Sequence, residues 1–179
     1  CLSCTATGAW ATAPLLTPAQ TKALGESGAH LIDIREGPAY ALQHVPGAVS
    51  APYPLWRAPG ANAGLPPSQP ALTALVQELG LTPDTPAVII YTGIDATDFG
   101  GAARVYWTLK SLGVQQLSIL NGGLTAWKAA GLPVASQASV ASRSRWQPQF
   151  NPQWMATRDQ VRASLDEPGV LRVDARPAP

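Results

Sequence analysis

The residues best placed for chemistry lie in a loop at positions 92–100, directly after a short apolar run at 88–91. In open α/β sheets, ligands bind at loops that leave the carboxyl end of a strand, because loop amides and the next helix N-terminus converge there. This loop contains Thr92, Asp95 and Asp98 together with glycine, but no cysteine, histidine or lysine. Its position therefore predicts a binding loop, whereas its composition lacks the usual nucleophiles.

The composition excludes several functional classes. The chain has 179 residues, 46% of them hydrophobic, and a formal net charge of +1. A core can therefore form, and nothing marks the protein for nucleic acid or for an anionic membrane. No apolar run approaches the roughly 18 residues of a membrane-spanning helix. We expect a soluble, globular protein.

Both cysteines, Cys1 and Cys4, lie in the first four residues. A redox pair needs a helix N-terminus to lower a thiol pKa, and the flanking sequence has no helical period. We therefore predict that residues 1–14 form a flexible N-terminus. The stretch at 9–11 has the small-x-small pattern of a signal-peptidase site, and Cys1 could alternatively be the lipid-modified first residue of a lipoprotein. Either would imply a periplasmic or otherwise exported protein; without them it would be cytoplasmic.

Short apolar runs alternate with helical patterns along the first two thirds of the chain. Strands are predicted at 30–34, 48–51, 88–91 and 117–120, and helices after Thr17 and at 68–79, 101–112 and 124–130. This alternation predicts a parallel, doubly wound sheet.

The pattern changes after residue 134. Residues 135–153 have no apolar period and are rich in Ser, Gln and Pro, which predicts a linker. Trp146, Phe150 and Trp154 are unusual in flexible sequence, and we expect them to pin the linker onto one or both neighbouring domains.

The sequence also contains an internal repeat. Residues 157–177 follow the plan of residues 17–38: a Thr-capped helix leads through Gly to a short strand that ends in Asp-x-Arg. The paired residues are Asp33 with Arg35, and Asp174 with Arg176. The repeat predicts one domain at 15–134 and the start of a second, truncated domain at 154–179.

Three segments, in this order, resemble the rhodanese superfamily, and specifically the N-terminal half of tandem thiosulfate and 3-mercaptopyruvate sulfurtransferases. They are LIDIREGPAYALQHVPGAVSAPY, VIIYTGIDATDFGGAARVYWTLKSLG and SILNGGLTAWKAAGLPV, which together span residues 31–134. The resemblance implies an α/β rhodanese-like fold with a five-stranded, mostly parallel sheet flanked by helices. It also implies chemistry without a metal or an organic cofactor.

In that family a cysteine directly follows the tyrosine of the central strand and carries the transferred sulfur as a persulfide. Here Thr92 follows Tyr91, and a threonine hydroxyl cannot form a persulfide. We therefore predict no catalytic residue in this chain and a relic of the active loop, whose two carboxylates would repel an anionic sulfur donor. The relic loop comprises Thr92, Gly93, Ile94, Asp95, Ala96, Thr97 and Asp98.

Two functions remain open at this point. The chain could be the silent N-terminal half of an enzyme that moves sulfur from thiosulfate or 3-mercaptopyruvate to a thiophilic acceptor. Its partners would then be a catalytic second domain and, in the parent enzyme, a small sulfur-donor anion. Alternatively, it could be a stand-alone, inactive binding or regulatory module. The repeated Asp-x-Arg start favours the first function, because a stand-alone module has no use for one fifth of a second domain.

Other residues of the family motifs have structural and functional interpretations. They are Asp33, Arg35, His44, Gly47, Arg104, Gly122, Gly123 and Trp127. Asp33 and Arg35 could clamp a substrate or tie the strand exit, and His44 could act as a base or hold its turn through backbone bonds. In both cases the structural role is favoured.

Arg104 is expected in the first turn of a helix, where a positive charge opposes the helix dipole. This placement predicts a specific structural partner, either Asp95 or Asp98 or a group on the neighbouring domain, rather than a bound ligand, which is the less favoured alternative. Gly122 and Gly123 are expected to form a tight turn between strand and helix, and Trp127 to fill the core or the domain interface.

Overall fold

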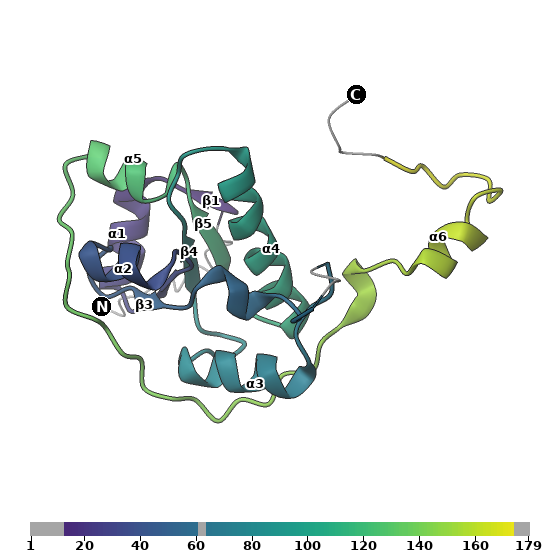
Figure 1. The fold of residues 1–179 in the computed structure, drawn as a ribbon, viewed down its shortest axis with the longest axis horizontal. Coiled ribbons are helices and arrows are strands. Elements are labelled where there is room, and N and C mark those ends of the chain that lie inside the picture. The colour runs from purple at the N-terminus through teal and green to yellow at the C-terminus, as the bar shows by residue number, and fades with distance from the viewer. Residues whose placement is uncertain (1–12, 61–63, 174–179) are drawn as a thin grey trace, which may run out of the picture.

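The computed structural model describes residues 13–60 and 64–173 and shows a five-stranded, all-parallel sheet (Figure 1). The strand order is β1-β5-β4-β2-β3, and each neighbouring pair is parallel. The expected α/β fold is thus confirmed, with every strand pair parallel. Cys1, Cys4, Asp174 and Arg176 lie outside the described residues, so the predictions that rest on them stay predictions.

The elements follow the alternation that the sequence predicts. The strands are β1 (Leu15–Leu16), β2 (His30–Asp33), β3 (Val49–Ser50), β4 (Ala87–Ile90) and β5 (Leu117–Leu120). The helices are α1 (Pro18–Glu26), α2 (Gly37–Leu42), α3 (Gln69–Glu78), α4 (Ala96–Leu112), α5 (Gly123–Ala129) and α6 (Arg158–Ala163). Two 3-10 turns, η1 (Tyr53–Trp56) and η2 (Pro152–Trp154), complete the described elements.

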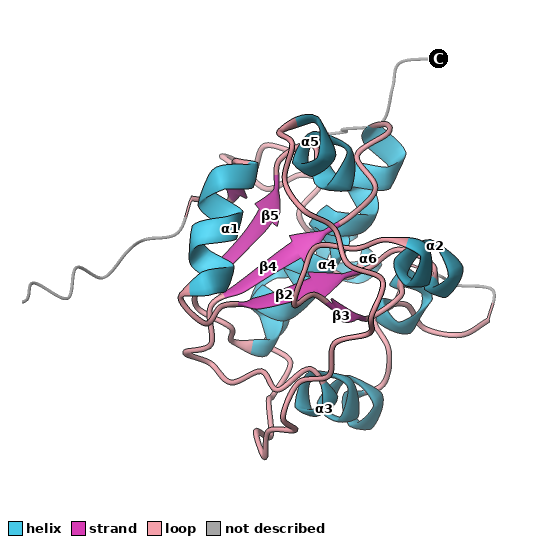
Figure 2. Ribbon diagram, turned by 90° about the vertical axis from the view of Figure 1, so that its left-hand side faces the viewer, coloured by secondary structure: helices cyan, strands magenta, loops and turns pink. Residues whose placement is uncertain are grey.

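The central strand β4 divides the core into two layers, because successive strand residues point to opposite faces of the sheet. Ala87 and Ile89 join α3, α4 and η1 in one apolar cluster, whereas Val88 and Ile90 join residues of α1 and α5 in another. The first face carries α3 and α4, and the second carries α1 and α5 (Figure 2). Both faces of β4 are therefore dry, which is typical of a parallel sheet.

Helix α4 begins five residues earlier than the predicted start at Gly101. The Gly100-Gly101 pair indicated a break, but Asp95 caps the helix and accepts a hydrogen bond from the amide of Asp98 at 2.9 Å. The cap and the buried face that starts at Ala102 outweigh the low helix propensity of the two glycines. The helix ends at Leu112 and is followed by Gly113, whose φ of 105° is the left-handed conformation that glycine favours.

The N-terminal segment joins the sheet at its β1 edge. Within the segment predicted to be flexible, the carbonyl of Ala13 accepts a hydrogen bond from Ser118 Oγ, and that of Pro14 accepts one from the amide of Ile119. Strand β1 was not predicted, because two residues carry no period. No helix of the described ranges is both long and apolar enough to cross a membrane.

Residues 134–155, called the strap from here on, cross the surface from α5 past α3 to α4 (Figure 1). Isolated bridges join Ala135 to His44 and Ser139 to Val49, so the strap partly covers the edge strand β3. Trp146 and Phe150 pack against the main core cluster. Beyond the strap, α6 has no buried residue and extends away from the domain.

Trp56 tests how strongly the core depends on η1. Its side chain is fully buried and its indole N–H donates to the carbonyl of Ala51 at 3.0 Å. We expect Trp56→Ala to lower the free energy of unfolding in urea by about 3–5 kcal/mol. Trp154 is 52% exposed, and Trp154→Ala should cost less than about 1 kcal/mol. Equal losses for the two variants would contradict the placement of η1.

Candidate functional site

The loop after β4 lies at the carboxyl edge of the sheet, as its position in the sequence predicts. It borders a cavity of about 460 Å³. Polar side chains from three elements line this cavity, together with Tyr53 and the apolar Ile34, Ala39 and Ile94. The polar members are Arg35, Glu36, Thr92, Asp95, Thr97 and Asp98.

The amides of the loop are already bonded to a carboxylate of the same chain. Asp98 Oδ2 accepts hydrogen bonds from the amide of Gly93 at 2.7 Å and from that of Ile94 at 3.2 Å. Asp98 lies in the first turn of α4, where the helix dipole also favours a negative charge. The carboxylate therefore occupies the two amide donors that an incoming anion would use.

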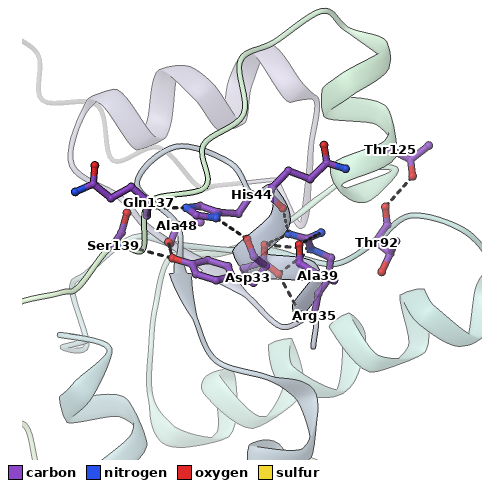
Figure 3. Close-up of polar contacts among 11 residues, drawn as sticks. Asp33, Arg35, Ala39, His44, Ala48, Thr92, Thr125, Gln137 and Ser139 are labelled. Atoms are coloured by element: carbon purple, nitrogen blue, oxygen red, sulfur yellow. Dashed lines mark hydrogen bonds and ion pairs between the residues drawn. The ribbon is translucent and has the colours of Figure 1, made fainter. Parts of the chain in front are cut away.

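The N-terminus of α5 is occupied in a comparable way. The amide of Leu124 donates to the carbonyl of Tyr91 at 2.9 Å, and that of Thr125 donates to the carbonyl of Thr92 at 3.0 Å. Thr125 Oγ1 also donates to the carbonyl of Thr92 at 2.9 Å (Figure 3). Sequence reasoning missed Thr125, although a threonine in the first turn of a predicted helix was a signal. These bonds fix the loop backbone rather than leave α5 free for a ligand.

Glycines allow this close contact. A Cβ atom on Gly93 would lie 1.9 Å from the carbonyl oxygen of Gly122, and one on Gly123 would lie 2.5 Å from the carbonyl oxygen of Tyr91. Gly93, Gly122 and Gly123 all have positive φ. The strand-to-helix turn at Gly122 and Gly123 is therefore tight, as the sequence indicates, and it lies in direct contact with the relic loop.

Asp33 and Arg35 form a buried ion pair beside this edge (Figure 3). Arg35 Nη2 lies 2.7 Å from Asp33 Oδ2, and Arg35 Nε lies 3.0 Å from Asp33 Oδ1. The guanidinium also donates to the carbonyls of Gln43 at 2.7 Å and Ala39 at 3.5 Å, and the backbone amide of Arg35 donates to Asp33 Oδ1 at 3.0 Å. Because the guanidinium is bonded to the protein on several sides, this geometry supports the structural interpretation, in which the pair ties the strand exit to α2.

His44 is fully buried, and both of its ring nitrogens face backbone carbonyls (Figure 3). Nδ1 lies 2.8 Å from the carbonyl oxygen of Tyr40, and Nε2 lies 3.1 Å from that of Gln137. The ring also stacks on Tyr40, with centroids 3.9 Å apart. This arrangement supports a turn-holding role rather than a catalytic base, and Gly47 with φ of 80° completes the turn.

Arg104 does not pair with Asp95 or Asp98. Because α4 begins at Ala96, Arg104 lies in the third turn of the helix rather than the first. Its Nη2 donates to the carbonyl of Gly64 at 2.7 Å, and its guanidinium lies 4.6 Å from the ring centroid of Trp107. The expectation of a loop partner was therefore wrong, since it rested on the misplaced helix start.

Tyr91 lies between β4 and the loop, and Trp127 lies in α5. Burial raises the pKa of Tyr91, a backbone hydrogen bond with Gly122 lowers it, and the carboxylate of Asp98 raises it further. The phenol thus stays protonated near neutral pH and supplies no base. Trp127 is buried, and its indole N–H donates to the carbonyl of Pro133 at 2.8 Å.

The described residues offer no metal centre, because they contain no group of three or more His, Cys, Asp or Glu side chains that could hold an ion.

A model of the rhodanese-like domain matches residues 17–130. The chain belongs to the rhodanese-like domain family.

Curated relatives of this rhodanese-like chain are sulfurtransferases. It is 33% identical over 186 residues to a probable 3-mercaptopyruvate sulfurtransferase of Pseudomonas aeruginosa, covering 93% of this chain and 63% of that protein. It is 34% identical over 148 residues to a thiosulfate sulfurtransferase of Azotobacter vinelandii, covering 82% and 53%. Bovine (Bos taurus) thiosulfate sulfurtransferase is 33% identical over 110 residues, covering 62% and 36%. The chain thus spans less than two thirds of each of these relatives.

A solved structure shares the fold. The 3-mercaptopyruvate sulfotransferase SseA of Escherichia coli superposes with a TM-score of 0.75 at 22% identity, covering 93% of this chain and 66% of that one. At this identity the likeness bears on the fold alone.

The contact between the relic loop and the α5 turn can be tested at Gly93. Gly93→Ala should lower the free energy of unfolding by about 3 kcal/mol or more, because it adds a clash to the strain of a positive φ. Gly131 also has positive φ, but a Cβ there would meet nothing within 4 Å. Gly131→Ala is therefore the matched control and should cost only about 1–2 kcal/mol. Similar losses in urea unfolding would contradict the close contact.

Proposed function

We propose that this chain is the catalytically silent N-terminal half of a tandem sulfurtransferase. The parent would transfer sulfur from thiosulfate or 3-mercaptopyruvate to a thiophilic acceptor through a cysteine persulfide carried by a second domain. The observation that carries the proposal is the state of the relic loop. Thr92 occupies the position after Tyr91, and the carboxylate of Asp98 is bonded to the loop amides.

The chemistry of sulfur transfer explains why such a loop is silent. A cysteine thiolate attacks the outer sulfur of the donor and keeps that sulfur as a persulfide, while the rest of the donor leaves with the bonding electron pair. A threonine hydroxyl ionises far above neutral pH and forms no stable equivalent of the persulfide. The loop would also have to stabilise an anion beside the existing carboxylates of Asp95, Asp98 and Glu36, which repel it.

Two further observations support a second domain. The curated relatives extend well beyond the region that this chain matches. In addition, α6 begins with the same capping box as α1: Thr157 and Gln160 exchange the hydrogen bonds that Thr17 and Gln20 exchange. The described residues 171–173 form no strand, so the repeat of β2 stays a prediction. We propose that Ile94, which is 71% exposed at the cavity rim, faces the second domain.

The silent loop can be tested by restoring the missing thiol. In a background with Cys1→Ser and Cys4→Ser, we expect Thr92→Cys to produce no more thiocyanate from thiosulfate and cyanide than the background protein does. The reason is that Asp98 still occupies the amides that would stabilise the thiolate and the bound anion. Measurable turnover by the folded Thr92→Cys variant would show that the loop remains a competent site and would contradict the proposal.

The tandem arrangement can be tested by the intact mass of the native protein from its source cells. We expect a mass larger than the 18.7 kDa of this chain by about one further domain of ordinary size. A native mass of 18.7 kDa, or of 18.7 kDa plus only a lipid on Cys1, would instead favour the stand-alone binding module.

A further inference from the structure

The strap is attached to the domain by side chains that bind its backbone. Gln69, in the first turn of α3, uses both ends of its carboxamide for this purpose. Its Nε2 donates to the carbonyl of Pro148 at 2.7 Å, and its Oε1 accepts from the amide of Phe150 at 3.1 Å. A neighbouring β-strand would offer an extended chain the same pair of groups.

Gln77, two turns further along α3, binds the strap through its side-chain amide and its backbone carbonyl. Its Nε2 donates to the carbonyl of Trp146 at 2.8 Å, and its own carbonyl accepts from the amide of Ser144 at 2.9 Å. Its Oε1 also accepts from Arg143 Nη2 at 3.4 Å. The strap residues whose backbone groups are bound are thus 144, 146, 148 and 150, which is every second residue.

The spacings of the helix and the strap match. Eight residues separate Gln69 from Gln77, which is about 12 Å along an α-helix. Gln77 binds residues 144 and 146 and Gln69 binds residues 148 and 150, so the two bound pairs are centred four residues apart, which is about 13 Å of extended chain. Gln77, the later helix residue, binds Trp146, and Gln69, the earlier one, binds Phe150, so the strap runs antiparallel to α3. One helix face therefore holds an extended segment in a single register.

Side chains of the strap also attach it to the domain, because they pack against the core. Trp146 and Phe150 are partly buried against the main core cluster, and Pro148 is buried between them. The ring of Phe150 meets that of Trp107 edge to face, with centroids 5.5 Å apart. Gln147 is exposed, as is Gln149, so the surface selects an extended Trp-x-Pro-x-Phe segment.

The bound segment ends close to the start of the predicted second repeat. The amide of Asn151 donates to the carbonyl of Ser111 at 2.7 Å, and Trp107 Nε1 donates to the carbonyl of Trp154 at 3.1 Å. Thr157 then caps α6. Only six residues lie between Phe150 and that cap, which leaves little free chain between the domain and the repeat.

We propose that Gln69 and Gln77 form a backbone clamp that fixes the point from which the second repeat leaves the first domain. The clamp makes the strap a rigid connection rather than a free tether, so the two halves of the parent are held in one arrangement. Gln69 and Gln77 are positioning residues in this role. The inference rests on the proposed function only in that a second repeat follows the strap.

Hydrogen exchange tests the clamp directly. In the double variant Gln69→Ala/Gln77→Ala, the amides of Phe150 and Asn151 should exchange about tenfold faster, because three hydrogen bonds to the strap backbone, each of modest net strength, are lost. The matched control, Gln147→Ala/Gln149→Ala, should exchange like the unaltered chain. Unchanged exchange at both strap amides in the clamp variant would overturn the proposal. The amides of β4 report whether the domain is folded, and Gln69→Ala alone should still release Phe150 if the double variant unfolds.

A distance measurement tests the positioning. Spin labels at Lys128→Cys and Gln153→Cys, both exposed, are placed in the Cys1→Ser/Cys4→Ser background. We expect a narrow distance distribution in the chain and in the Gln147→Ala/Gln149→Ala control, and a broad one in the clamp variant. Equally narrow distributions in all three proteins would overturn the inference. Neither readout depends on sulfur transfer or on the native mass, so the clamp and the proposed function can fail separately.

Discussion

The hydrogen bonds from the amides of Gly93 and Ile94 to the carboxylate of Asp98 determine which donors remain available at the carboxyl edge of the sheet. In an α/β sheet this edge presents unpaired amides to anions, because strands end and helices begin there. Here the chain supplies its own anion, held by the first turn of α4. The edge keeps the architecture of a ligand site, while the amides of Gly93 and Ile94 are already bonded within the chain.

The neighbouring elements depend on that closed loop. The amides of Leu124 and Thr125 and the hydroxyl of Thr125 bind carbonyls of Tyr91 and Thr92, and this approach requires glycine at 93 and 123. Farther along the edge, Asp33 and Arg35 hold the exit of β2 through a buried pair. The polar side chains of Asp33, Arg35, Asp98 and Thr125 are thus bonded within the domain.

Much of the fold could be predicted from the sequence because its signals are local. Strands β4 and β5 are short apolar runs, and α1 begins with a Thr-Pro cap that any helix rule identifies. The two-residue strand β1 could not be predicted, since it exists only through pairing with β5, which lies about a hundred residues away. The start of α4 was misplaced because Gly100 and Gly101 indicate a break, whereas the cap at Asp95 decides the boundary.

The candidate site shows the same division. The absence of the cysteine at position 92 and the presence of two nearby carboxylates were evident from the residues. The sequence did not indicate what those carboxylates bind. Whether Asp98 repels a sulfur-donor anion or bonds to the loop amides depends on geometry that residue identities do not give. The strap is similar. Its aromatic residues indicated attachment, but two ordinary glutamines on α3 make backbone contacts that no sequence pattern marks.

The measurement that tests this account most directly is a titration of the isotopically labelled chain with thiosulfate, followed through the amide resonances of Gly93 and Ile94. A matched titration with sodium chloride at equal ionic strength serves as the reference. If the carboxylate of Asp98 occupies these donors, both resonances should move no further with thiosulfate than with chloride, up to millimolar concentrations. A saturable shift of the two amides with thiosulfate alone would show that the loop still accepts a sulfur-donor anion, and would contradict the account.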